Sequence, residues 1–175
     1  MRTMAVEQSR FRGIYLEHHT SVLGYCLRRV AFDDAADVAA EVFATAWRKH
    51  ATMPEGDLVL PWLYAVAART VANHRRASRR RGDLAAKTRG LPRASVAPAE
   101  AVVVQRSENA KVVEAIRTLR ATDREILMLS AWEGLSAPQI AVSLGITPMA
   151  AEKRLTRAKH RLAGAIERGM ERRIP

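Results

Sequence analysis

Apolar residues recur at steps of three and four along most of this chain, which is the spacing expected of amphipathic helices. Over residues 11–30 this pattern predicts a first helix. Asp33 and Asp34 then interrupt the apolar positions and offer N-cap oxygens for a second helix, expected over residues 35–50. The second helix is expected to bury one apolar side, formed by Val38, Val42, Ala46 and Trp47.

The third predicted helix changes character along its length. Residues 52–60 contain Pro54 and Gly56 and predict a loop, and Pro61 is well suited to begin the helix that follows. The first three turns of that helix have an apolar side, whereas its end is crowded with arginine. Five guanidinium groups in seven positions repel one another unless an anion lies close, although a solvated charged tail is the simpler alternative. These residues are Arg75, Arg76, Arg79, Arg80 and Arg81.

A break in the pattern divides the chain in two. Residues 82–101 contain two prolines among small and polar neighbours and show no period, so we expect a flexible linker there. The low aromatic content of 5% and the abundance of Ala, Val and Leu favour helical packing over a thick sheet-based core. The sequence therefore predicts an all-α protein with two small helical domains, at 1–81 and 102–175, joined by this linker.

The second domain carries the pattern of a helix-turn-helix. Ser136 and Gln139 have the form of a capping box, and Gly145, nine residues after Ser136, permits a sharp turn. Thr147 followed by Pro148 predicts the start of the next helix. A further capping-box pattern at residues 122–125 predicts an additional helix upstream.

The long helix after Thr147 has a basic outer side that suits DNA. An α-helix fits the major groove, where long cationic side chains reach phosphates and base edges. The alternative is a helical hairpin with a purely structural role, and the basic side favours DNA binding over it. This side carries Lys153, Arg154, Arg157, His160 and Arg161.

Charge and cysteine content narrow the functional classes. The formal charge of +11 indicates a polyanionic partner, because each cation placed on a phosphate releases condensed counterions, although an anionic membrane surface would also attract it. Cys26 is the only cysteine, which excludes an intrachain disulfide and suits a reducing, cytoplasmic compartment. No apolar run approaches the length of a membrane span, so no membrane insertion is expected. The sequence shows no phosphate-cradling glycine loop, metal cluster or nucleophile with its base, so we expect neither a cofactor nor enzymatic activity.

Three segments in order carry a resemblance to a family of transcription factors. They are DAADVAAEVFATAWRKH, PWLYAVAARTVANHRRASRRR and LRATDREILMLSAWEGLSAPQIAVSLGITPMAAEKRLTRAKHRL. Around a linker of this length they resemble the extracytoplasmic-function (ECF) group of bacterial RNA polymerase sigma factors, over nearly the whole chain. The resemblance implies a sigma factor that directs core RNA polymerase to specific promoters and assists DNA opening.

The resemblance also implies roles for the first domain. The helix matching residues 37–47 docks on a coiled coil of the polymerase's largest subunit in such factors, and the matching positions here are Asp37, Glu41, Val42 and Phe43. Core packing is an equal alternative for the last two. The part matching residues 52–81 captures unpaired bases of the promoter −10 element, which a basic groove with base pockets can do. The candidates for this capture are Arg69, Asn73, Arg75, Arg76 and Arg79.

In the second domain, the helix from Pro148 matches the reader of the promoter −35 element. Ala150 and Glu152 stand where a Thr and a Lys are common in the family, so the promoter sequence is left open. The candidates for this contact are Thr147, Met149, Ala150, Lys153, Arg154 and Arg157.

The resemblance implies core RNA polymerase, promoter DNA and an anti-sigma protein as partners. The leading alternative is a helix-turn-helix transcriptional regulator without a sigma role, which would need only the second domain. It leaves the acidic and arginine-ended helices of the first domain unexplained. A basic protein of the membrane surface is a further alternative, and it predicts liposome binding instead of promoter specificity.

Overall fold

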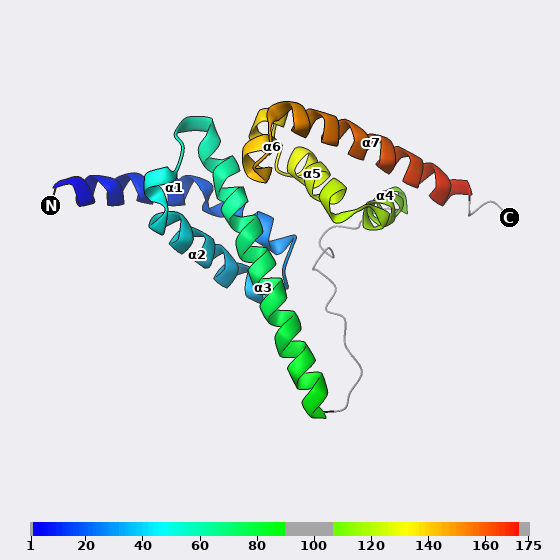
Figure 1. Ribbon diagram of the computed structural model, residues 1–175, viewed down its shortest axis with the longest axis horizontal. Coiled ribbons are helices and arrows are strands. Elements are labelled where there is room, and N and C mark those ends of the chain that lie inside the picture. Colours follow the sequence, from blue (N-terminus) through cyan, green and yellow to red (C-terminus); the bar gives the residue numbers. More distant parts are fainter. Residues whose placement is uncertain (1, 90–106, 172–175) are drawn as a thin grey trace. The chain divides into compact units, whose positions relative to one another are not determined.

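The computed structural model describes residues 2–89 and 107–171 of the chain. Every regular element in these two ranges is a helix, which confirms the predicted all-α class (Figure 1). The chain divides into two compact units, Met1–Val102 and Val103–Pro175, and each has its own buried core. A search of the described helices finds none that is both long enough and apolar enough to cross a membrane.

The first unit contains three long helices, α1 (Arg2–Leu27), α2 (Phe32–Arg48) and α3 (Val59–Arg89). Two single 3-10 turns, His50–Thr52 and Gly56–Leu58, connect α2 to α3. Each long helix contacts the other two, and their apolar sides meet in one core. The largest fully buried side chains of this core are Val22, Tyr25, Val38, Val42 and Leu63.

A buried arginine at the turn between α1 and α2 fixes the position of α3. The ring of Tyr25 stacks on that of Tyr64 from α3, with centroids 5.1 Å apart, and the Arg29 guanidinium lies 3.5 Å from the Tyr25 centroid. The backbone oxygen of Arg29 accepts a hydrogen bond from Nε of Arg75, at 2.9 Å. Aromatic stacking, a cation–π contact and a charge-assisted hydrogen bond therefore join α3 to α1 and to the turn that follows α1.

Two helices of the first unit are longer than the sequence pattern predicts. α1 begins nine residues before the expected start. Within the added residues, Arg10 pairs with Glu55 at 3.0 Å and the Glu7 carboxylate lies 3.6 Å from Nε2 of His50. Trp47 is partly exposed, contrary to the prediction that it is buried. α3 continues to Arg89, so the predicted linker does not begin at residue 82; the rest of that predicted linker, 90–101, lies outside the described residues.

The predicted N-cap role of Asp33 and Asp34 is wrong. α2 begins at Phe32, and its N-cap is Ala31, which has no side-chain acceptor. The two aspartates instead lie in the first turn, where the helix dipole favours negative charge. The Asp34 carboxylate lies 3.0 Å from Nε2 of His74 on α3, so this acid stabilises a contact between helices.

The second unit is formed by α4 (Ser107–Thr118), α5 (Ala121–Ala131), α6 (Ala137–Leu144) and α7 (Pro148–Glu171). α7 is the longest of these helices and contacts each of the other three (Figure 1). Its apolar side packs small residues against branched ones from α5 and α6. The most deeply buried of these residues are Ile126, Leu129, Ile140, Ala151 and Ala158.

Helices α6 and α7 form the predicted helix-turn-helix, and its local signals are confirmed. Ser136 and Gln139 form a capping box at the start of α6, and Gly145 ends that helix with φ of +64°, a conformation that favours glycine. The hydroxyl oxygen of Thr147 accepts a hydrogen bond from the backbone N–H of Ala150 at 3.2 Å, which caps α7. The additional helix predicted from residues 122–125 is α5, but the capping box is not formed, because α5 begins at Ala121 and its N-cap is Arg120.

Candidate nucleic-acid interfaces

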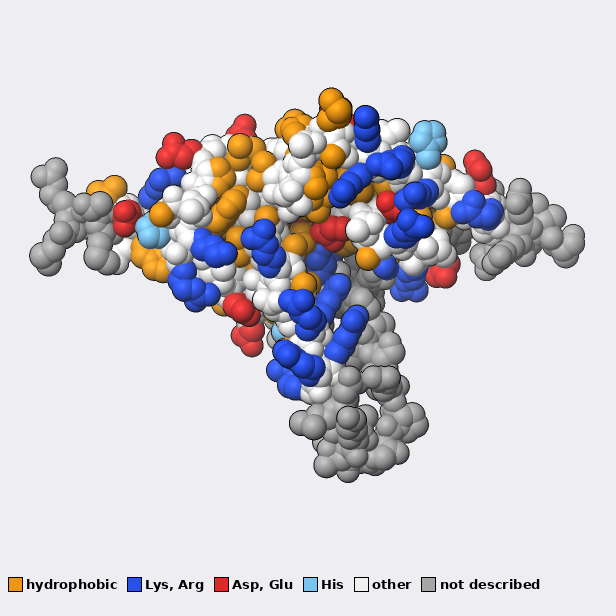
Figure 2. Space-filling view, in the orientation of Figure 1, with side chains coloured by type: hydrophobic (Ala, Val, Ile, Leu, Met, Phe, Trp, Pro, Cys, Tyr) orange, Lys and Arg blue, Asp and Glu red, His pale blue; other side chains and the backbone are white. Residues whose placement is uncertain are grey.

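One exposed face of α3 presents a row of polar and cationic side chains. Arg69, Asn73, Arg76 and Arg80 follow one another at steps of four, three and four residues, so they share one side of the helix. All four are exposed, and Figure 2 shows the Lys and Arg side chains gathered along α3. The opposite side of the same helix is buried in the core of the first unit, through Leu63, Val66, Ala67 and Thr70.

The predicted −10 candidates on α3 divide into two groups. Arg69, Arg76 and Arg79 are exposed, and Nη2 of Arg76 donates to Oδ1 of Asn73 at 2.5 Å, which orients the Asn73 amide. Arg75 instead donates to the backbone oxygen of Arg29. The structure therefore places Arg75 in a structural contact that holds α3 on the turn between α1 and α2. Arg80 was not among the candidates, although its spacing from Arg76 could have indicated it.

The predicted polymerase-docking residues on α2 are likewise split by burial. Asp37 and Glu41 are exposed and lie one turn apart, so they share a face. Val42 is 0% exposed and Phe43 is 4% exposed, and the Phe43 ring packs edge-on against Tyr15 of α1, with centroids 4.8 Å apart. Both side chains pack in the core, which is the alternative that the sequence left open for them.

The predicted −35 candidates lie on the first three turns of α7. Met149, Lys153, Arg154 and Arg157 are exposed, whereas Ala150 is partly buried. The hydroxyl of Thr147 already caps the helix, so its side chain serves first to start α7. The exposed candidates Met149 and Lys153 are four residues apart and share the outer side of α7.

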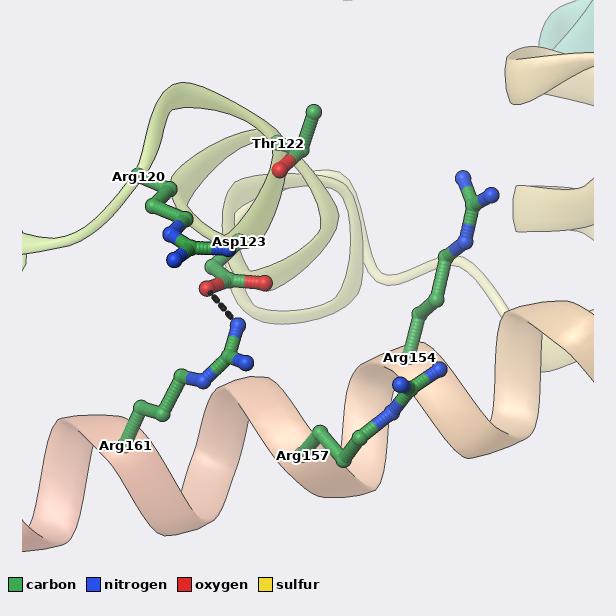
Figure 3. A pocket seen from close by; sticks show the side chains of 6 residues that line it. All are labelled: Arg120, Thr122, Asp123, Arg154, Arg157 and Arg161. Atoms are coloured by element: carbon green, nitrogen blue, oxygen red, sulfur yellow. Dashed lines mark hydrogen bonds and ion pairs between the residues drawn. The ribbon is translucent and has the colours of Figure 1, made fainter.

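A cluster of arginines lines a cavity between the start of α5 and α7 (Figure 3). Arg154, Arg157 and Arg161 come from successive turns of α7, and Arg161 reaches Asp123 of α5 in an ion pair of 2.5 Å. Arg120 and Thr122 complete the wall from the α5 side. Arg161 lies on the basic side that the sequence predicted for this helix, although it was not among the −35 candidates. No signal there indicates Arg120 or Asp123, because tertiary packing brings them to α7.

The site residues carry positive charge and amide groups, and the described parts of the chain assemble no cluster of three or more His, Cys, Asp or Glu that could hold a metal ion. Guanidinium groups exposed on a helix suit phosphate oxygens, with which they form paired, charge-assisted hydrogen bonds. Each unit thus presents one basic helix, α3 in the first and α7 in the second, with the chemistry of a nucleic-acid contact.

Comparisons with known proteins agree with this arrangement in both units. Residues 14–81 match the family model for Sigma-70 region 2, and residues 109–162 match that for Sigma-70, region 4. The ECF RNA polymerase sigma factor SigD of Mycobacterium tuberculosis is 34% identical over 153 residues, which cover 83% of this chain and 71% of SigD. The RNA polymerase sigma factor NccH of Alcaligenes xylosoxydans is 28% identical over 160 residues, covering 89% of this chain and 86% of NccH.

A solved structure shows the same fold. The sigma factor RpoE of Bartonella quintana, determined in complex with the anti-sigma factor NepR, superposes with a TM-score of 0.61 at 22% identity, covering 90% of this chain and 97% of RpoE. This chain belongs to the ECF group of RNA polymerase sigma factors. It is therefore a promoter-directing transcription factor, and the alternative of a regulator that needs only its helix-turn-helix leaves the region 2 match unexplained.

Proposed function

We propose that α2 docks on core RNA polymerase, that α3 captures the melted −10 element, and that α7 reads the −35 element. The observation that carries this proposal is the exposed row on α3 formed by Arg69, Asn73, Arg76 and Arg80. A row of exposed arginines interrupted by one amide suits a strand of nucleic acid better than a protein core. The region 2 match over the same residues supports the assignment to the −10 element.

The geometry of α3 suits a single strand. Cations that follow one helix face can track a phosphate backbone, while an amide among them can form hydrogen bonds with the edge of an unpaired base. Asn73 is held for such a role by Arg76, which donates to its oxygen and leaves the amide N–H groups free to donate to a base. Arg75 acts indirectly, because it keeps α3 in place through the Arg29 carbonyl.

On α7, the outer side at the start of the helix is proposed to enter the major groove. Met149 offers an apolar contact of the kind that thymine methyl groups accept, and Lys153 and Arg154 can reach base edges or phosphates. Thr147 and Ala150 act through the cap that begins the helix. These contacts select the upstream element, and the phosphate contacts among them set its register.

Core polymerase docking is assigned to the exposed acidic pair on α2. Asp37 and Glu41 form a negative patch on a protein with a formal charge of +11, so they suit a basic partner surface. Val42 and Phe43 support this patch from below by packing α2 on α1. We place the protein in the cytoplasm with the polymerase, assign it no catalytic step of its own, and infer an anti-sigma protein as its regulator, as RpoE has in NepR.

Run-off transcription with purified core polymerase tests the proposed function as a whole. The chain is expected to confer selective initiation on a subset of a promoter library, and permanganate footprinting is expected to show DNA opening only when core polymerase is present. The second expectation follows because opening costs about 1.4 kcal/mol per stacked step, which a few cations cannot offset alone. Initiation without selectivity, or opening by the isolated chain, would contradict the proposal.

Arg157→Ala is expected to weaken binding to the −35 element and to reduce transcription from the same promoter in parallel. The side chain is exposed and its loss opens no cavity, so the melting temperature should stay unchanged. A gel-shift titration of the holoenzyme on promoter DNA measures the effect, with Arg168→Ala as the control, since Arg168 is an exposed arginine three turns further along α7. Equal promoter activity for both variants would remove Arg157 from the interface.

A further inference from the structure

The cavity between α5 and α7 gathers more positive charge than its walls neutralise. Its volume is about 260 Å³, and its lining contains four guanidinium groups and one carboxylate, which leaves an excess of three positive charges. Figure 3 shows that these groups come from two helices, with Arg154, Arg157 and Arg161 on α7 opposite Arg120 and Asp123. Such an excess in a concave site raises the local concentration of anions.

Asp123 is the acidic residue of the wall, and it holds one of the arginines. Its carboxylate accepts from Nη1 of Arg161 at 2.5 Å, and the Asp123 side chain is 11% exposed, whereas that of Arg161 is 48% exposed. The pair joins the first turn of α5 to the middle of α7, so the Arg161 guanidinium stays at the wall beside Asp123 (Figure 3). Asp123 is therefore a positioning residue for Arg161.

The other three guanidinium groups have donors to spare. Arg157 uses Nε for the backbone oxygen of Lys153, at 3.1 Å, which leaves its terminal amino groups for another acceptor. Within the described ranges, no carboxylate lies at ion-pair distance from Arg120, Arg154 or Arg157. A planar guanidinium fork matches the spacing of two phosphate oxygens, so the chemistry of the cavity selects a phosphate group.

We propose that this cavity binds a phosphate of the DNA backbone beside the −35 element, with Arg120 and Arg157 as its principal ligands. The inference rests on the proposed function of α7 and extends it to α5, because Arg120 lies outside the helix-turn-helix. Two helices then hold one strand, which fixes the register of α7 in the groove. By holding Arg161 and cancelling one charge, Asp123 limits the part of the affinity that is independent of sequence.

The salt dependence of holoenzyme binding to promoter DNA tests the Arg120 contact. For Arg120→Gln, the slope of log K against log salt is expected to become less steep by about 0.9, the value for one phosphate on duplex DNA. If the variant and the wild type bind equally at 1 M salt, the variant is expected to bind roughly fivefold more weakly than the wild type at 0.15 M salt, with the same sequence preference. Arg117→Gln is the matched control, because Arg117 lies in the last turn of α4, outside the cavity, and pairs with Glu114 at 3.7 Å. An equal slope for wild type and Arg120→Gln would overturn the inference.

Asp123→Asn is expected to change the slope in the opposite direction. Removing the carboxylate releases Arg161 to a phosphate, so the slope should steepen by about 0.9 and non-specific DNA binding should tighten. A purely structural ion pair would give a lower melting temperature with the slope unchanged, and that result would overturn the positioning role. Because Asn retains a side-chain oxygen acceptor at this buried position, the variant is expected to fold, so its salt slope can be measured.

A second experiment distinguishes a phosphate of the DNA backbone from a free phosphate compound. Calorimetric titration of the full chain with inorganic phosphate, at constant ionic strength, is expected to show no binding at millimolar concentration. Phosphate binding that Arg120→Gln abolishes, together with an unchanged DNA slope, would assign the cavity to a free phosphate compound and overturn the DNA contact. If wild type confers promoter selectivity in run-off transcription and only the slope fails to change, the inference alone is wrong; without selectivity, the proposed function itself fails.

Discussion

Replacing Arg69, Arg76 and Arg80 together by glutamine is expected to remove most promoter opening by the holoenzyme while leaving the first unit folded. All three side chains are exposed on one face of α3, and glutamine has nearly the same helix propensity as arginine. Loss of three contacts to single-stranded phosphates flattens the salt slope by about 2. If the variant and the wild type capture the melted strand equally at 1 M salt, the variant is expected to capture it on the order of 50-fold more weakly at 0.15 M salt.

Permanganate reactivity of the −10 region and the salt slope of open-complex formation measure this effect. The matched control removes three cations elsewhere in the same unit, through Arg12, Arg48 and Lys49, which are exposed and lie off α3. Because both triple variants change the net charge equally, a general loss of attraction to DNA would affect them alike. Comparable opening by the two would show that the α3 row has no specific role.

Sequence rules succeeded where the structure depends on neighbouring residues alone. The capping box at Ser136, the left-handed Gly145 and the Thr147 cap each need only a few consecutive residues, and the structure shows all three where the sequence predicted them. The periodicity of three and four likewise predicted which side of α2 is buried, with Val38 and Val42 in the core. The fold class and the helix-turn-helix follow from such local signals.

At the starts of α2 and α5, the first turn contains an acid that pairs with a side chain of a distant helix. Asp34 pairs with His74, 40 residues away, and Asp123 pairs with Arg161, 38 residues away. Neither partner can be read from the sequence around the acid. In the same way, Arg10 in the early part of α1 pairs with Glu55, a partner that local periodicity does not contain.

The candidate site shows the same division between local and tertiary information. Spacing along α3 and α7 predicts which cations share a face, and resemblance to sigma factors indicates their role. Neither the spacing nor the resemblance shows that Arg75 is held by the Arg29 carbonyl or that Arg120 joins the arginines of α7. Both facts depend on how separate helices pack, so only the folded structure distinguishes cations available to DNA from cations that position the helices.

The proposed polymerase-docking surface consists of the side chains that α2 exposes, so substitutions there can be separated from substitutions in the core. Val42 and Phe43 lie in the core, so their replacement by alanine tests stability: losing a buried aromatic or branched side chain costs about 2–5 kcal/mol whether or not polymerase binds. Asp37 and Glu41 are exposed, so a change there leaves the core intact and reports on the partner. An acidic pair on a strongly basic protein also orients the chain at the encounter, because the rest of its surface is repelled by a basic partner.

Reversal of both charges, as Asp37→Arg with Glu41→Arg, is therefore expected to reduce affinity for core polymerase by on the order of 100-fold or more. Placing like charges opposite each other at an interface costs several kcal/mol, and about 1.4 kcal/mol is already a factor of ten. Analytical co-elution with core polymerase measures the loss, and the melting temperature should not fall, since arginine favours a helix more than aspartate does. The control reverses Glu7 and Glu17 on α1, which changes the net charge equally. If the control and the α2 variant lose affinity to the same extent, long-range charge alone explains the effect and the acidic pair is not the docking surface.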